Sequence, residues 1–164
     1  MATGPRYSVD FRRRRKGKTN YAKRKKLLVK QVPRLVVRKS NKYITAHITS
    51  YDAVGDKTSV FARSSELKKL GWKYSCKNLS AAYLTGLLIG KKAIKAGVKE
   101  VILDLGLYTI TKGSRLFSML KGAVDAGLKI SHDPKMFPSE ERITGKHISE
   151  NLPKDFEEVK KKIV

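Results

Sequence analysis

The chain of 164 residues is long enough for one domain with a buried core, and its 37 Lys and Arg against 14 Asp and Glu give a net charge of +23. Because this charge works against the compact state of the isolated chain, it favours a polyanionic partner. The single cysteine, Cys76, excludes an internal disulfide and a thiolate zinc site, and no apolar run approaches the ~18 residues that cross a bilayer. Because arginines also replace the apolar stretch of a secretory signal, we expect a cytoplasmic protein without membrane contacts.

Residues 1–32 are predicted to form a basic RNA-binding arm. The first 30 residues hold twelve Lys or Arg and one Asp, but few large apolar side chains. Such a segment cannot bury enough surface to offset the entropy of ordering, so we expect the arm to be disordered when free. Thr19 is a candidate cap for a short basic helix that runs through Tyr21 and Leu28 and forms on contact with RNA.

An α/β body is predicted for residues 33–131, and it begins with three antiparallel strands. The strands are expected at residues 34–38, 43–51 and 58–63, with turns at residues 40–42 and 55–56 between them. In the second strand, Ile44, Ala46 and Ile48 alternate with polar residues, which predicts one buried face. The opposite face of this meander is free to carry polar groups.

A helix and a further strand are predicted after the meander. Asn78 or Ser80 is expected to cap a helix that reaches Lys95, with Gly97 just past its end. Its apolar side is predicted to contain Leu79, Tyr83, Leu87 and Ile94. Residues 101–105 predict a strand buried on both faces, because their apolar residues do not alternate, and the preceding helix suggests a crossover to a parallel strand.

The rest of the chain is predicted to be mainly helical. A second helix is expected at residues 114–126, with Leu116, Phe117, Leu120 and Val124 inward, followed by a short strand at 128–130. Residues 132–164 predict a helical tail on or near the body, in which Ser139 caps one helix and Pro153 opens another. This tail holds seven Lys or Arg and seven Asp or Glu, so it is neutral. The order of elements predicts an α/β fold with ribonuclease H-like topology.

Two clusters indicate phosphate binding. The first is the run at residues 12–16 with Lys18 and the cluster at residues 23–26, since guanidinium and ammonium groups neutralise phosphates and release counterions. The second is the polar loop at residues 106–113 and the helix start after it, because the carboxyl ends of strands and helix N-termini attract anionic ligands. Lys112, Ser114 and Arg115 would add donors there, and Tyr108 would stack on an exposed base. A glycine-rich polar loop is equally typical of a simple tight connection.

Catalytic and metal sites are not expected. A nuclease with this topology would need carboxylates that converge on paired metals, but the first strand contains no acid to meet Asp104. Residues 86–91 lack the spacing of a P-loop, and Gly86 and Gly90 are instead expected to let another element pack closely. The three histidines share no metal-ligand spacing. We therefore expect no enzyme activity, no metal, no cofactor and no small-molecule substrate.

Several long motifs, in order, resemble the L-eighteen family of large-subunit ribosomal proteins in its archaeal form. They are GPRY at 4–7, RRRRKGKTNY at 12–21, PRLVVRKSNKYI at 33–44, GW at 71–72, AAYLTGLL at 81–88, GSRLF at 113–117, GAVDAGL at 122–128 and FPSEERITGKHI at 137–148. The resemblance implies a protein of the central protuberance that binds 5S rRNA, contacts large-subunit rRNA and lies beside other large-subunit ribosomal proteins. In longer archaeal relatives an insertion follows the part that matches Ile148, and here that link to Asn151 is nearly absent.

The resemblance and the clusters together give a set of candidate RNA contacts. A general basic protein that binds nucleic acids without preference for 5S rRNA is the alternative. The candidate contacts are Arg6, Arg12, Arg13, Arg14, Arg15, Lys16, Lys18, Tyr21, Arg24, Arg38, Lys39, Asn41, Lys42, Tyr108, Lys112, Ser114 and Arg115.

Overall fold

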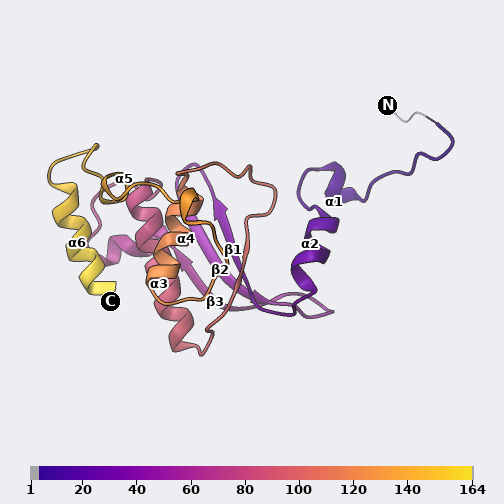
Figure 1. Ribbon diagram of the computed structural model, residues 1–164, viewed down its shortest axis with the longest axis horizontal. Helices are drawn as coiled ribbons and strands as arrows, with labels where there is room; N and C mark the ends of the chain where they lie inside the picture. Colours follow the sequence, from indigo (N-terminus) through magenta and orange to yellow (C-terminus); the bar gives the residue numbers. More distant parts are fainter. Residues whose placement is uncertain (1–3, 164) are drawn as a thin grey trace.

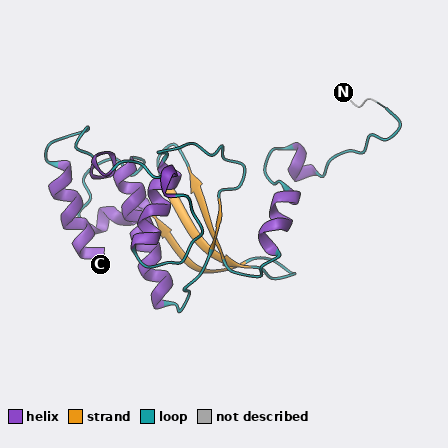
Figure 2. Cartoon of the chain, viewed as in Figure 1, coloured by secondary structure: helices purple, strands orange, loops and turns teal. Residues whose placement is uncertain are grey.

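The computed structural model describes residues 4–163 and shows a sheet covered by helices, with a helical arm at one end. The basic arm and the C-terminal helix lie at opposite ends of the longest axis (Figure 1). Two long helices run along one face of the sheet between these ends (Figure 2). No helix within residues 4–163 is both long and apolar enough to cross a membrane.

The sheet contains four strands in the order β3-β2-β1-β4. They are β1 (Arg34–Lys39), β2 (Ile44–Ser50), β3 (Lys57–Arg63) and β4 (Ile102–Asp104). The first three form an antiparallel meander and β4 pairs in parallel with β1, which confirms the predicted α/β topology. Ile44, Ala46 and Ile48 are fully buried, as their alternation predicts.

Strand β4 is shorter and less buried than predicted. Ile102 and Leu103 are only half-buried, because β4 lies at the edge of the sheet. Beyond it, the predicted strand at residues 128–130 is reduced to a single parallel bridge between Glu100 and Lys129. The expectation of a strand buried on both faces is therefore wrong for the centre of β4.

Helices α3 (Leu79–Lys95) and α4 (Arg115–Asp125) pack closely against each other on the inner face of the sheet. A side chain at Gly86 would overlap the backbone of Met119, and one at Gly122 would overlap the backbone of Tyr83. The predicted close approach at Gly86 is confirmed. The predicted apolar side of α3 is wrong at Ile94, which is 43% exposed. Helix α3 is instead central and buried on several sides, because α4, the sheet and the C-terminal helix all pack on it.

A second hydrophobic cluster joins α3 to the C-terminal part of the chain. It includes Leu67 of the 3-10 helix η1 (Ser64–Leu70) and Phe156 of helix α6 (Leu152–Ile163), both fully or almost fully buried. Helix α5 (Glu140–Thr144) adds Ile143 to this cluster, whereas Met136 of the 3-10 turn η2 (Pro134–Met136) packs against the main core. The helical tail is confirmed, whereas η1 was not predicted.

Two helices form in the arm, α1 (Arg12–Arg15) and α2 (Tyr21–Leu28). The cap of α2 is Asn20, whose side chain accepts a hydrogen bond from the backbone N–H of Lys23. Thr19 is therefore not the cap; its hydroxyl accepts from Arg13 Nε at 2.9 Å. Residues 1–3 of the predicted arm lie outside the described residues.

Candidate nucleic-acid interface

The arginine run of the arm lies on the single turn of α1. Arg12 to Arg15 and Lys16 are exposed, and successive positions on a helical turn point in different directions. The rings of Phe11 and Tyr21 pack edge to face, with centroids 5.4 Å apart, and both remain exposed. The arm thus presents guanidinium groups together with aromatic surface.

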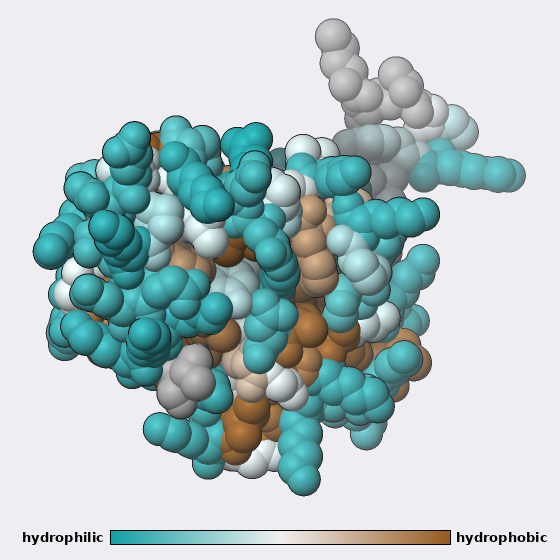
Figure 3. Space-filling model, turned by 60° about the vertical axis from the view of Figure 1, so that its left-hand side comes forward, coloured by the Kyte–Doolittle hydropathy of each residue, from teal (hydrophilic) through white to brown (hydrophobic). Residues whose placement is uncertain are grey.

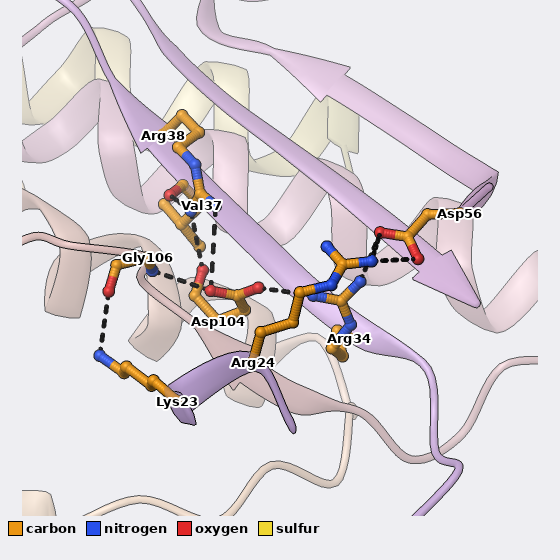
Figure 4. A network of polar contacts seen from close by, with 8 residues as sticks. All are labelled: Lys23, Arg24, Arg34, Val37, Arg38, Asp56, Asp104 and Gly106. Atoms are coloured by element: carbon orange, nitrogen blue, oxygen red, sulfur yellow. Dashed lines mark hydrogen bonds and ion pairs between the residues drawn. The ribbon is translucent and has the colours of Figure 1, made fainter. Parts of the chain in front are cut away.

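Helix α2 is held against the sheet by two polar contacts, one with the loop after β4 and one with the turn between β2 and β3. Lys23 Nζ donates to the carbonyl of Gly106 at 3.0 Å, and Arg24 Nη2 contacts both carboxylate oxygens of Asp56 at 2.9 and 3.0 Å (Figure 4). Gly106 follows β4, and Asp56 lies in the turn between β2 and β3. These contacts connect three segments that are far apart in the sequence.

A buried charge network lies beneath α2 on the outer face of β1 and β4. Arg34 donates to Asp104 at 2.8 Å and to Asp56 at 2.6 Å, and its side chain is 3% exposed (Figure 4). Arg38 lies 3.8 Å from the other Asp104 oxygen and donates to the backbone carbonyl of Asp104 at 3.1 Å. The backbone N–H of Gly106 also donates to Asp104, at 2.8 Å.

This network gives Asp104 a structural role. Strand β1 supplies a cation and no acid to the Asp104 carboxylate, because Arg34 pairs with it. Within residues 4–163, His, Cys, Asp and Glu side chains form no group of three able to hold a metal ion. The Asp104 carboxylate is therefore paired with the guanidinium groups of Arg34 and Arg38 and holds them in position.

The loop after β4 is joined to the end of β1 through Tyr108. Its hydroxyl donates to the carbonyl of Lys39 at 2.8 Å and accepts from the N–H of the same residue at 3.2 Å. The Lys39 ammonium lies 5.1 Å from the centroid of the Tyr108 ring. One end of the ring is therefore fixed, and the ring is half-buried. Stacking of Tyr108 on a base stays a prediction.

The turn between β1 and β2 projects basic and polar side chains into solvent. The Ser40 hydroxyl accepts hydrogen bonds from the backbone N–H groups of Lys42 and Tyr43 at 3.3 and 2.9 Å. This local bonding shapes the turn. Lys39, Asn41 and Lys42 are all exposed around it.

Two adjoining clefts bring many of the predicted residues together. One, of about 210 Å³, lies between the arm and the sheet, and six cationic side chains and one carboxylate line it. The second, of about 330 Å³, extends toward Tyr108 and shares Lys18 and Arg38 with the first. The charged residues of the first cleft are Arg13, Lys18, Lys23, Arg24, Arg34, Arg38 and Asp104.

Other predicted residues lie apart from these clefts. Arg6 is exposed in the chain that precedes α1, and Lys112 is exposed in the loop before α4. Arg115 donates to the carbonyl of Lys77 at 3.1 Å, and the hydroxyl of Ser114 is buried without a partner or a capping role. The helix start at α4 is thus separate from the arm clefts.

Sequence reasoning missed two cations of the first cleft as site residues. Lys23 belongs to the basic cluster at residues 23–26, which gave a signal for it, and it faces the sheet while Lys25 and Lys26 are exposed. Arg34 carried a different signal, a charge directly before the apolar run Leu35, Val36 and Val37 of β1. A charge in such a strand needs a buried partner, and Asp104 on the neighbouring strand supplies it.

A histidine close to Arg38 of these clefts has a lowered pKa. His47 lies next to Val36 in the sheet and stacks on Phe61, with ring centroids 5.5 Å apart. Burial, and then the charge of Arg38, lower the pKa of His47 below its ordinary value. The imidazole is therefore kept neutral beside a concentration of positive charge.

The side of the molecule that carries α6 differs from the arm. Figure 3 shows this side turned forward, with hydrophilic side chains over most of it and apolar patches between them. Acids and bases are balanced in the sequence from residue 132 onward. Positive charge is thus concentrated at the arm end.

Comparison with known proteins identifies relatives of the chain. The family described as "Ribosomal large subunit proteins 60S L5, and 50S L18" matches residues 5–101 and 95–133. The chain is also 52% identical over 153 residues to the large ribosomal subunit protein uL18 of Methanospirillum hungatei. That alignment covers 93% of this chain and 87% of the relative.

Proposed function

The chain belongs to the family of ribosomal large subunit proteins 60S L5 and 50S L18, and from this we propose that it binds 5S rRNA and helps to attach it to large-subunit rRNA in the central protuberance. It is a structural protein of the large ribosomal subunit and not an enzyme. Its partners in this proposal are RNA segments and neighbouring ribosomal proteins.

The observation that carries this proposal is the cleft between the arm and the sheet. Six cationic side chains and one carboxylate surround about 210 Å³, which leaves a strong positive excess in a concave site. Phosphate groups are the ligands that clustered guanidinium and ammonium groups bind best, because binding releases counterions and arginine forks match phosphate oxygens. The phosphates of a folded RNA strand between α2 and the loop after β4 neutralise this positive charge.

The arm and the body have different roles in this proposal. Exposed arginines of α1 neutralise phosphates without reading sequence, whereas the fixed clefts recognise the shape of 5S rRNA. Residues 1–32 act as the RNA-binding arm, residues 33–131 as the body and residues 132–164 as the neutral tail near other proteins. All the candidate contacts from the sequence are retained as RNA contacts, and Lys23 joins them, whereas the buried Arg34 supports the cleft through Asp104 and Asp56.

A competition experiment tests the proposal. The full chain is titrated with 5S rRNA and with an unrelated structured RNA of equal length at about 0.3 M salt, where purely electrostatic binding has weakened steeply. We expect a clear preference for 5S rRNA to persist. Equal affinity for both RNAs would reject the proposal and favour a general nucleic-acid-binding protein.

A further inference from the structure

A third cleft lies apart from the arm, between the β1–β2 turn and the segment that follows η1. Its volume is about 290 Å³, and it shares no lining residue with the two clefts beside the arm. Only Asn41 and Lys42 of its lining were predicted from the sequence as RNA contacts. The lining consists of Asn41, Lys42, Tyr43, Lys68, Tyr74, Ser75, Cys76 and Lys77.

The wall formed by residues 74–77 is anchored from the protein interior. Trp72 is 3% exposed, and its indole N–H donates to the carbonyl of Ser75 at 3.3 Å. The ring of Tyr74 packs edge to face on Trp72, with centroids 5.3 Å apart. Arg115 at the start of α4 donates to the carbonyl of Lys77. The segment is therefore held in place although it has no regular secondary structure.

The charged side chains that line this cleft are all lysines. Lys42, Lys68 and Lys77 are exposed, and no carboxylate lines the cleft. The carboxylate of Asp155 on α6 acts on Tyr74. Burial, followed by this carboxylate, raises the pKa of Tyr74 above its ordinary value, so its phenol remains neutral and does not repel an anion.

The aromatic side chains of the cleft differ in availability. The guanidinium of Arg63 lies 4.2 Å from the centroid of the Tyr43 ring, so one face of that ring is already covered. Tyr74 contacts Trp72 at an angle of 64° between the rings, which leaves it half-buried. Tyr74 is thus the better surface for a planar ligand.

We propose that this cleft binds one unpaired nucleotide of ribosomal RNA, with its phosphate among Lys42, Lys68 and Lys77 and its base against Tyr74. The inference rests on the proposed function for the class of ligand. The volume of about 290 Å³ is close to the lower end of the ~300–1,000 Å³ typical of small-molecule pockets, which suits a single nucleotide. Aromatic side chains with nearby cations are the usual means of binding single-stranded RNA. The protein then holds RNA at two separate places, one beside the arm and one beside the β1–β2 turn.

The first test removes the charge of the cleft in the full chain. The variant Lys42→Gln/Lys68→Gln/Lys77→Gln is compared with Lys95→Gln/Lys99→Gln/Lys146→Gln, which removes three exposed lysines that line none of these clefts. Affinity is measured against salt for 5S rRNA and, separately, for large-subunit rRNA. For one of these RNAs we expect the slope of log K on log salt to fall by about 0.7 more in the cleft variant than in the control, the value for one single-stranded phosphate.

The second test concerns the ring of Tyr74. Tyr74→Leu is expected to weaken binding of the same RNA about fivefold or more, whereas Tyr74→Phe keeps the ring and restores the affinity. Because Tyr74→Phe also removes the hydroxyl, its rescue separates stacking by the ring from any role of that hydroxyl beside Asp155. Ultraviolet cross-linking of the wild-type complex should add a nucleotide to the tryptic peptide of residues 74–77.

The results separate this inference from the proposed function. If the wild type does not prefer 5S rRNA, the proposed function fails, and the cleft is still judged on large-subunit rRNA. If the charge variant matches its control on both RNAs and no adduct forms on residues 74–77, the inference is overturned while the proposed function stands. If the charge variant binds both RNAs unchanged but is lost from assembled subunits, the cleft binds an acidic protein segment. This result would also overturn the inference.

Discussion

Arg34 Nη1 donates to a carboxylate oxygen of Asp104 at 2.8 Å across the parallel pair β1–β4, and both side chains are at most 10% exposed. The two residues are separated by 70 positions in the sequence. Removing one partner leaves the other charge buried and unpaired, whereas removing both leaves a site that apolar side chains can fill. This pair is therefore a structural centre beneath the basic arm.

The first prediction concerns this pair. Arg34→Met is expected to lower the free energy of unfolding by about 3–5 kcal/mol, because Asp104 loses its main buried counter-charge. Urea unfolding measures this change. The double variant Arg34→Met/Asp104→Leu should recover much of the loss. Lys57→Met, which breaks the exposed pair with Asp52, serves as the control and should leave the unfolding midpoint unchanged. Equal stability of the single variant and the wild type would show that the pair has no structural role.

Helix packing gives the second prediction. Gly86→Ala places a methyl group against the backbone of Met119, which belongs to α4 and cannot move as a flexible side chain can. We expect a loss of about 1–3 kcal/mol in the free energy of unfolding, the usual result of overpacking. Gly55→Ala is the matched control, since no atom lies within 4 Å of the added carbon. Thermal unfolding that is identical for Gly86→Ala and Gly55→Ala would contradict the close helix contact.

The three strands of the meander, the cap of α3 and the helical tail follow from local sequence patterns. Alternation in β2 predicts its buried face, and Asn78 caps α3 because its side chain accepts from Ala81 N–H. The 3-10 helix η1 was missed because its seven residues contain only two large apolar side chains, too few for a periodic signal. Its position is instead fixed by packing of Leu67 against α3 and α6.

The residue types of the candidate site could be predicted from the sequence, but their arrangement in space could not. The arginine run and the loop after β4 are visible in the sequence, but the contact of Lys23 with Gly106 joins residues 83 positions apart. The third cleft likewise depends on the approach of residues 74–77 to the β1–β2 turn. No local pattern encodes such contacts, because they depend on how the helices and strands pack together. Capping of α2 by Asn20 in place of Thr19 is a smaller error, since both residue types are good caps.

The third prediction concerns pH. The pKa of His47 is lower in the folded protein than its ordinary value of 6.5, so the unfolded chain binds more protons when the pH falls below that value. The contribution of His47 is therefore fully present above about pH 6.5 and decreases as the pH falls toward the folded pKa. His47→Gln should show a smaller loss of stability between pH 7.5 and about pH 5.5 than the wild type, measured by urea unfolding. An identical pH dependence in both proteins would contradict the role of burial and Arg38.

The last prediction tests how the arm gains affinity. Replacing the four arginines of α1 with glutamine removes four exposed positive charges and preserves good helix formers. If these side chains neutralise phosphates, the slope of log K on log salt for 5S rRNA should fall by about 0.7–0.9 for each phosphate that the arm no longer neutralises. A control with Lys95, Lys99, Lys146 and Lys161 replaced by glutamine removes the same charge away from the arm. Its slope should change much less, because those lysines make no phosphate contacts in the proposed complex. Equal slopes in the two variants would mean that net charge alone, and not the position of the arm, drives binding.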